Sequence, residues 1–135
     1  MMVFNDSISD AFTRIRNANL VGHNTVRVPL TLTTKSILNI LVHHGFIKNF
    51  SQINNREFLV TLKSPKTSVL RKLKRLSRPG CRLYVSAQNL PQLLRSGQLG
   101  LAPRAIIFLS TSKGILSDRE AQHLKVGGEL LGYVS

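Results

Sequence analysis

Acidic residues are scarce in this 135-residue chain, and their shortage is the first clue to its partners. Only 6 Asp and Glu stand against 19 Lys and Arg, which leaves a formal net charge of +13. A surplus of this size destabilises an isolated fold by self-repulsion and indicates a polyanionic partner. Nucleic acid is the commonest such partner, and an anionic membrane surface or a merely basic solvated surface are the alternatives.

Cysteine and long apolar runs are also nearly absent. The single Cys81 excludes an internal disulfide and suits a reducing compartment. No apolar run approaches the ~18 residues that a membrane-spanning helix needs. Because Asp6 and Asp10 come early, the start lacks the make-up of a signal or transit peptide, and we expect a mature, soluble chain. Cys, His and acidic residues nowhere have metal-ligand spacing, so we expect no cofactor.

What is present is a modest core, since 42% of the residues are apolar. Apolar residues at helical spacing predict a first helix from Asn5 to Asn19 and a second from Thr34 to His44. The expected N-caps of the first helix are Asn5, Asp6 or Ser7, and the glycines that end the two helices are Gly22 and Gly45. Strands are expected at Thr25–Val28, Phe46–Phe50 and Glu57–Leu62, the last two joined by a turn at Asn54-Asn55.

A linker at Ser64-Pro65-Lys66 predicts two domains, residues 1–64 with the order α-β-α-β-β and residues 65–135 with mainly antiparallel β structure. Leucine spacing from Leu70 to Ser77 fits a helix, but the segment leads into a turn and a strand-like stretch, so both assignments stay open. Further expected elements are strands at Leu83–Val85, Ala105–Leu109 and Leu130–Val134, a short helix near Asn89–Leu94, and another helix opened by the capping box Ser117-x-x-Glu120.

The positive charge is clustered between Arg56 and Arg82, where nine cations face the single acid Glu57. A surface that serves only solubility does not require such clustering, so we expect phosphates to lie there. Arg14, Arg16 and Asn17 form a smaller group on the first helix. Arg14 and Arg16 diverge by about 200° around the helix axis, so at most one can share a face with the apolar stripe.

Three hydroxyls, a lysine and a glycine follow an apolar run in Ser110-Thr111-Ser112-Lys113-Gly114. Ser110-x-x-Lys113 matches the serine-lysine signature of penicillin-recognising acyl enzymes, but the companion motifs are missing and the chain is too short. The glycines of a nucleotide-binding Walker loop are absent. A plain turn needs only the glycine and one hydroxyl. The surplus favours a rigid loop whose hydroxyls reach phosphates, ribose 2′-hydroxyls or base edges while Lys113 supplies charge.

Two residues outside this loop are further candidates. Tyr84 can stack on an unpaired base, although a core tyrosine fits equally well. Aromatic residues make up only 6% of the chain, so stacking is not the main binding mode. Glu129 follows the tight pair Gly127-Gly128, and it either orients Lys113 or Ser112 or is an exposed strand acid.

Five blocks, taken in order, resemble one known family. They read "DSISDAFTRIRNA" from Asp6, "HHGFI" from His43, "RLSRPGCRLYV" from Arg75, "LSTSKGILSDREA" from Leu109 and "GGELLGYV" from Gly127. Over its whole length the chain is similar to small-subunit ribosomal protein eight of the bacterial and organellar type. The resemblance implies an α+β fold of two small, tightly packed α/β domains, with a strand over Leu70 to Ser77. Ala102-Pro103-Arg104 interrupts the family pattern.

The resemblance also implies a function and a set of binding residues. Relatives of this type are non-enzymatic proteins that bind the central domain of small-subunit rRNA and help assemble the platform, beside small-subunit ribosomal protein five. Carried over by motif, the RNA-binding residues are Arg14, Asn17, Arg78, Pro79, Gly80, Tyr84, Ser110, Thr111, Ser112, Lys113 and Gly114, with Glu129 in support. Drift from the bacterial pattern favours an organelle, the plastid ahead of the mitochondrion, over a bacterial cytoplasm.

Overall fold

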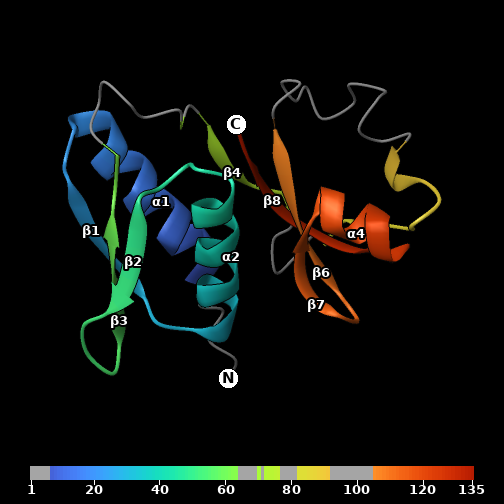
Figure 1. Ribbon diagram of the computed structural model, residues 1–135, viewed down its shortest axis with the longest axis horizontal. Helices are drawn as coiled ribbons and strands as arrows, with labels where there is room; N and C mark the ends of the chain where they lie inside the picture. Colours follow the sequence, from blue (N-terminus) through green and yellow to red (C-terminus); the bar gives the residue numbers. More distant parts are fainter. Residues whose placement is uncertain (1–6, 64–69, 71, 77–81, 92–104) are drawn as a thin grey trace. The chain divides into compact units, whose positions relative to one another are not determined.

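The computed structural model describes residues 7–63, 70, 72–76, 82–91 and 105–135. The chain divides into two compact units, Met1–Arg71 and Lys72–Ser135, each with its own antiparallel sheet (Figure 1). The predicted α+β class is therefore confirmed. The expected linker at residues 64–66, the interruption at residues 102–104 and the second half of the predicted helix near Asn89–Leu94 lie outside the described residues.

The first unit has the predicted α-β-α-β-β order, with its sheet strands arranged β1-β3-β2. Its elements are α1 (Ser7–Val21), β1 (Thr25–Pro29), α2 (Leu32–His43), β2 (Asn49–Gln52) and β3 (Glu57–Thr61). Val28 pairs with Phe58, and both share a sheet face with Val60. All three are buried, so this face carries the core of the unit.

Both helices of the first unit end at the glycines that the sequence indicated. Gly22 and Gly45 have φ angles of 79° and 78°, in the left-handed region that glycine adopts without strain. The residue after each glycine bonds back across the last turn: the His23 N–H donates to Ala18 O at 2.9 Å, as does the Phe46 N–H to Leu41 O. These are the bonds of a Schellman ending.

Among the boundaries of the first unit that differ from the prediction, α1 ends at Val21 instead of Asn19, and the starts of α2 and β2 also differ. Helix α2 begins at Leu32, two residues early, because the Thr31 hydroxyl accepts the N–H of Thr34 at 3.0 Å and so caps the helix. Strand β2 begins at Asn49, whereas Phe46 was expected to start it. Phe46 and Ile47 are buried in the core just after the end of α2. This burial accounts for their apolar side chains without strand pairing.

The second unit is mainly antiparallel β, as predicted. Its elements are β4 (Leu73–Arg75), β5 (Tyr84–Val85), β6 (Ile106–Thr111), β7 (Gly114–Ser117), α4 (Asp118–Leu124) and β8 (Gly128–Val134). The strands are arranged β4-β8-β6-β7, and β5 also pairs with β8. Strand β4 lies within the stretch from Leu70 to Ser77, so the strand that the resemblance implied is present there.

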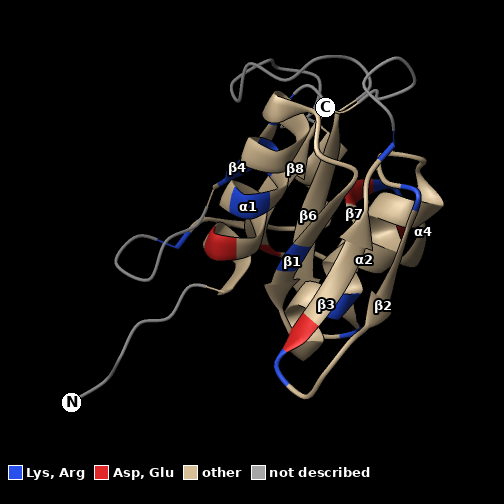
Figure 2. Cartoon of the chain, turned by 90° about the vertical axis from the view of Figure 1, so that its left-hand side faces the viewer, with Lys and Arg blue, Asp and Glu red and all other residues tan. Residues whose placement is uncertain are grey.

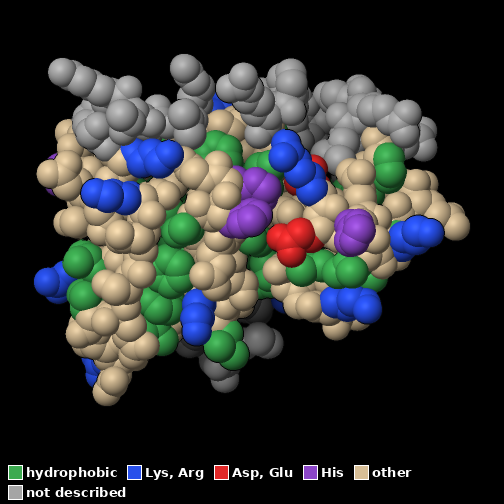
Figure 3. Space-filling view, in the orientation of Figure 1, with side chains coloured by type: hydrophobic (Ala, Val, Ile, Leu, Met, Phe, Trp, Pro, Cys, Tyr) green, Lys and Arg blue, Asp and Glu red, His purple; other side chains and the backbone are tan. Residues whose placement is uncertain are grey.

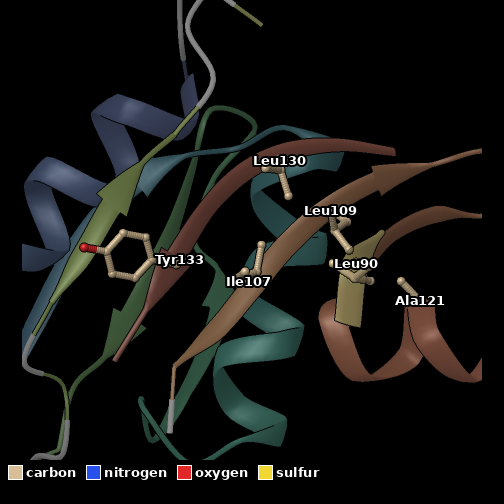
Figure 4. Packing of buried hydrophobic residues seen from close by; sticks show 6 residues of the cluster. All are labelled: Leu90, Ile107, Leu109, Ala121, Leu130 and Tyr133. Atoms are coloured by element: carbon tan, nitrogen blue, oxygen red, sulfur yellow. The ribbon is translucent and has the colours of Figure 1, made fainter. Parts of the chain in front are cut away.

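A compact apolar cluster holds α4 against one face of this sheet (Figure 4). Its members are Leu90, Ile107, Leu109, Ala121, Leu130 and Tyr133. The predicted capping box opens α4: the Ser117 hydroxyl accepts the N–H of Glu120 at 3.3 Å and donates to its carboxylate at 3.3 Å. Helix α4 therefore starts directly after β7.

Candidate nucleic-acid interface

The hydroxyl-rich segment is the tip of the β6–β7 hairpin. Thr111 pairs with Gly114, so only Ser112 and Lys113 form the turn, while Ser110 and Thr111 belong to strand β6. The Thr111 hydroxyl accepts the N–H of Lys113 at 3.1 Å and donates to Gly114 O at 2.7 Å. Gly114 has a φ of 105°. Thr111 and Gly114 thus build the turn, which presents the exposed Ser112 and Lys113.

A row of polar side chains crosses the sheet beside this turn. In the strand register Tyr84 lies opposite Glu129, and Glu129 lies opposite Ser110. Residues directly opposite one another in a sheet share a face, so the three side chains line one face across β5, β8 and β6. Leu109 and Leu130, the next register pair, point into the core on the other face (Figure 4). The structure therefore brings three predicted residues into one row, and a fourth, Ser112, lies just beyond Ser110 in the turn.

Two glycines make this row possible. A Cβ added at Gly128 would lie 2.0 Å from the Ser110 carbonyl oxygen, and one added at Gly127 would lie 2.3 Å from that of Val85. No larger residue fits at either position without moving a neighbouring strand. The pair lets the start of β8 approach the backbones of both neighbours, which sets Glu129 between Tyr84 and Ser110.

Glu129 is held inside this row. Its side chain is only 15% exposed, so the exposed-acid alternative is wrong. The Glu129 carboxylate lies 3.8 Å from the guanidinium of Arg82, whose side chain is 59% exposed. Sequence reasoning counted Arg82 in the basic cluster but did not assign it to the site. Its spacing was the available signal, because Arg82 precedes Tyr84 by two residues and strand side chains alternate with period two.

Tyr84 is 68% exposed, so the alternative of a core tyrosine is wrong and its ring is accessible to a partner. Lys72 and Lys74 are exposed at strand β4. Lys and Arg side chains are spread over the face shown in Figure 3, where acidic ones are sparse. The predicted contacts Arg78, Pro79 and Gly80 lie outside the described residues.

The other two predicted residues, Arg14 and Asn17, lie on α1 in the first unit. Both are exposed, as is Arg16. Arg14 Nε donates to Asp10 at 3.0 Å, and its Nη1 donates to the Arg27 carbonyl at 3.2 Å. Among the described residues Asn17 has no such partner. The sequence predicted RNA binding for both Arg14 and Asn17, whereas in the structure the two residues differ in their contacts.

The described residues offer no metal-ligand cluster, and none of their helices has the length and apolar character needed to cross a membrane. The buried Asp118, at the start of α4, is structural: its Oδ1 accepts the Ile107 N–H at 3.3 Å. Burial raises the pKa of its carboxyl above the usual 3.8, against the lowering effect of its backbone hydrogen bonds. The described candidate residues include exposed cations, hydroxyls and the ring of Tyr84.

A small, strongly basic α+β fold with such a surface is typical of proteins that bind nucleic acid. The chain belongs to the ribosomal protein S8 family, whose model matches residues 6–135. Small ribosomal subunit protein uS8c of Rhodomonas salina is 43% identical to it, covering 96% of this chain and 98% of the relative. Small ribosomal subunit protein uS8 of Acholeplasma laidlawii is 46% identical, covering 98% of this chain and 99% of the relative.

These matches confirm the family that the sequence blocks indicated. The family is one of structural, non-enzymatic proteins, and the chain shares it almost end to end. The prediction that the chain is not an enzyme is thereby confirmed, and the Ser110-x-x-Lys113 match carries no hydrolase chemistry.

Proposed function

We propose that this protein is a structural constituent of the small ribosomal subunit that binds the central domain of small-subunit rRNA and helps assemble the platform. The observation that carries the proposal is the family match over residues 6–135. The names of the relatives, small ribosomal subunit proteins from algae and bacteria, support the first part. The net charge of +13 supports the second, because RNA supplies the counter-charge that the isolated chain lacks.

In this proposal the hairpin tip supplies specificity and the cations supply affinity. Ser112 and Lys113 are exposed on a turn that internal hydrogen bonds hold rigid. Hydroxyls of this kind bind ribose 2′-hydroxyls and base edges in the shallow minor groove of an irregular RNA helix. Tyr84 adds one ring for a single unpaired base. We also propose RNA contacts for Arg78, Pro79 and Gly80, which lie outside the described residues, and a supporting role for Glu129 through Arg82.

Two finer parts of the proposal concern neighbours and compartment. The protein neighbour we propose is small-subunit ribosomal protein five. The compartment we propose is the plastid, which the uS8c proteins of Rhodomonas salina and Gracilaria tenuistipitata support. The similar identity of bacterial uS8 proteins keeps a bacterial cytoplasm as the other candidate.

Footprinting of the full chain on small-subunit rRNA tests the proposal. We expect protection of an irregular helix in the central domain at a protein concentration that leaves the other domains unprotected. Protection spread over all domains would show that the protein binds RNA through its charge without specificity. No protection at low ionic strength would remove rRNA as the partner.

A further inference from the structure

Arg14 is the centre of a charged cluster in the first unit. Besides its hydrogen bonds to Asp10 and to the Arg27 carbonyl, its Nη1 lies 3.8 Å from Glu57 Oε2. The other oxygen of Glu57 lies 3.8 Å from the guanidinium of Arg27. One side chain of α1 thereby contacts the edge strand β1 and the central strand β3. Figure 2 marks the basic positions on α1 and β1 and the acidic positions on α1 and β3.

The composition makes this cluster informative. Asp10 and Glu57 are the only acidic residues between residues 7 and 71, and both lie against Arg14. The cluster of two carboxylates and two guanidiniums is neutral as a whole. It adds nothing to the positive potential that attracts RNA, so its acids have a function inside the protein.

If Arg14 turned away to bind a phosphate, this cluster would lose its central cation. Asp10 would face the approaching RNA without its cation, Glu57 would keep only Arg27 at 3.8 Å, and carboxylates repel phosphates. The Arg27 carbonyl would lose its side-chain donor. A phosphate contact by Arg14 is therefore opposed by the same residues that surround it.

Asn17 has the opposite environment on the same helix. The buried residues of α1 are Ile8, Ala11, Phe12, Ile15 and Ala18. At about 100° per residue, Arg14 and Arg16 lie at the two borders of the exposed arc opposite them, and Asn17 lies near its middle. Apolar packing of these five residues holds α1 in place, and the directional hydrogen bond from the planar guanidinium of Arg14 to the Arg27 carbonyl adds a restraint on the rotation of the helix.

We propose that Arg14 is a positioning residue, which fixes the rotation of α1 on the sheet so that Asn17 meets the RNA, and that Arg14 neutralises no phosphate itself. The proposal rests on the proposed rRNA binding. It assigns the same task to Glu57, which the sequence analysis noted only as the single acid of the basic stretch. It also assigns a phosphate-facing role to Arg16, whose only recorded contact among the described residues is a 3.3 Å hydrogen bond to the Thr13 hydroxyl.

The test compares Arg14→Gln, Arg14→Lys, Glu57→Gln and the matched control Arg16→Gln. Each full-length variant is measured for affinity to a central-domain rRNA fragment over a salt series, at a temperature where circular dichroism shows all of them folded. We expect Arg14→Gln, Arg14→Lys and Glu57→Gln each to lower affinity about fivefold, the equivalent of one hydrogen bond, at unchanged salt slope. Arg16→Gln should reduce the slope by about 0.7 to 0.9.

Asn17→Ala closes a double-mutant cycle with Arg14→Gln. Because Arg14 acts through Asn17, we expect the second substitution to add little to the loss from the first. The side-chain amide resonances of Asn17 in the RNA-free protein should shift in Arg14→Gln and in Glu57→Gln but stay in place in Arg16→Gln. This measurement does not require RNA. It therefore tests the positioning of Asn17 even if the wild type does not bind the fragment, a result that would contradict the proposed function alone.

Other outcomes would overturn the proposal. A salt slope that falls in Arg14→Gln and is restored by Arg14→Lys would make Arg14 a phosphate contact, and Glu57→Gln should then raise affinity. Lowered thermal stability with wild-type affinity and an unmoved Asn17 resonance would make Arg14 merely structural.

Discussion

At the scale of single residues, the three hydroxyls of the hairpin tip have different tasks. Thr111 makes two hydrogen bonds inside the turn, and Ser110 lies in the row beside Glu129. Ser112 is exposed and makes no recorded hydrogen bond to a described residue. Its hydroxyl is therefore the one available to a partner without loss to the fold.

Replacing Ser112 with Ala should weaken binding to central-domain rRNA more than binding to random RNA of the same length. One neutral hydrogen bond contributes about 1 kcal/mol, and one to a charged group about 1.5 to 3 kcal/mol. Filter binding of both RNAs measures the difference. Lys72→Ala is the control, because loss of an exposed charge should weaken both RNAs alike. Equal losses for Ser112→Ala would contradict its role in specificity.

The buried carboxyl of Asp118 should make the free energy of unfolding depend on pH. Its folded pKa is raised by burial, so between the usual value of 3.8 and the raised value the folded state binds more protons than the unfolded state. This carboxyl therefore favours folding most at low pH, and its contribution is lost as the pH rises through the raised pKa.

Asp118→Asn keeps an oxygen acceptor for the Ile107 N–H and cannot ionise. Relative to the wild type, its free energy of unfolding should increase as the pH rises from 3.8 through the raised pKa of Asp118, and then level off. Urea unfolding across this pH range measures the difference. A difference that is independent of pH would show that the carboxyl does not titrate in the folded protein within the range.

At the scale of elements, the sequence was most informative where one residue type has one conformational use. Gly22 and Gly45 end helices at positive φ, and Ser117 with Glu120 opens α4, as the patterns indicated. Apolar character alone was less informative. Phe46 is buried either as a strand residue or as a helix-end contact, so β2 was placed too early.

The row at the site needed the sheet register, which the sequence does not contain. Tyr84, Glu129 and Ser110 come from three separate strands, and no local pattern pairs them. Arg82 was missed for a different reason, because its two-residue spacing from Tyr84 was a local signal that was not used. The loop itself was found because Ser110 to Gly114 is contiguous, although two of its five residues lie in strand β6.

Gly128→Ala tests the close approach of β8 to β6. The added Cβ would lie 2.0 Å from a backbone oxygen that no side-chain motion can remove, so the strand must shift. We expect a loss of about 1 to 3 kcal/mol in the free energy of unfolding, as for other overpacked positions, together with weaker rRNA binding. Gly114→Ala is the matched comparison, because its Cβ meets nothing within 4 Å and only the φ of 105° is strained.

At the scale of the whole molecule, the net charge predicts how strongly binding depends on salt. If about six of the 19 Lys and Arg neutralise phosphates, each releases counterions, and affinity falls roughly a thousandfold between 50 and 200 mM salt. If the cluster around Arg14 neutralises no phosphate, as we propose, the slope comes from the cations between Arg56 and Arg82 together with Arg16 and Lys113. A filter-binding titration with central-domain rRNA measures the slope, and Lys72→Ala and Lys74→Ala should each reduce it by about 0.7 to 0.9. A flat response would mean that hydroxyl and base contacts carry the affinity, and the surplus charge would then need a partner other than rRNA.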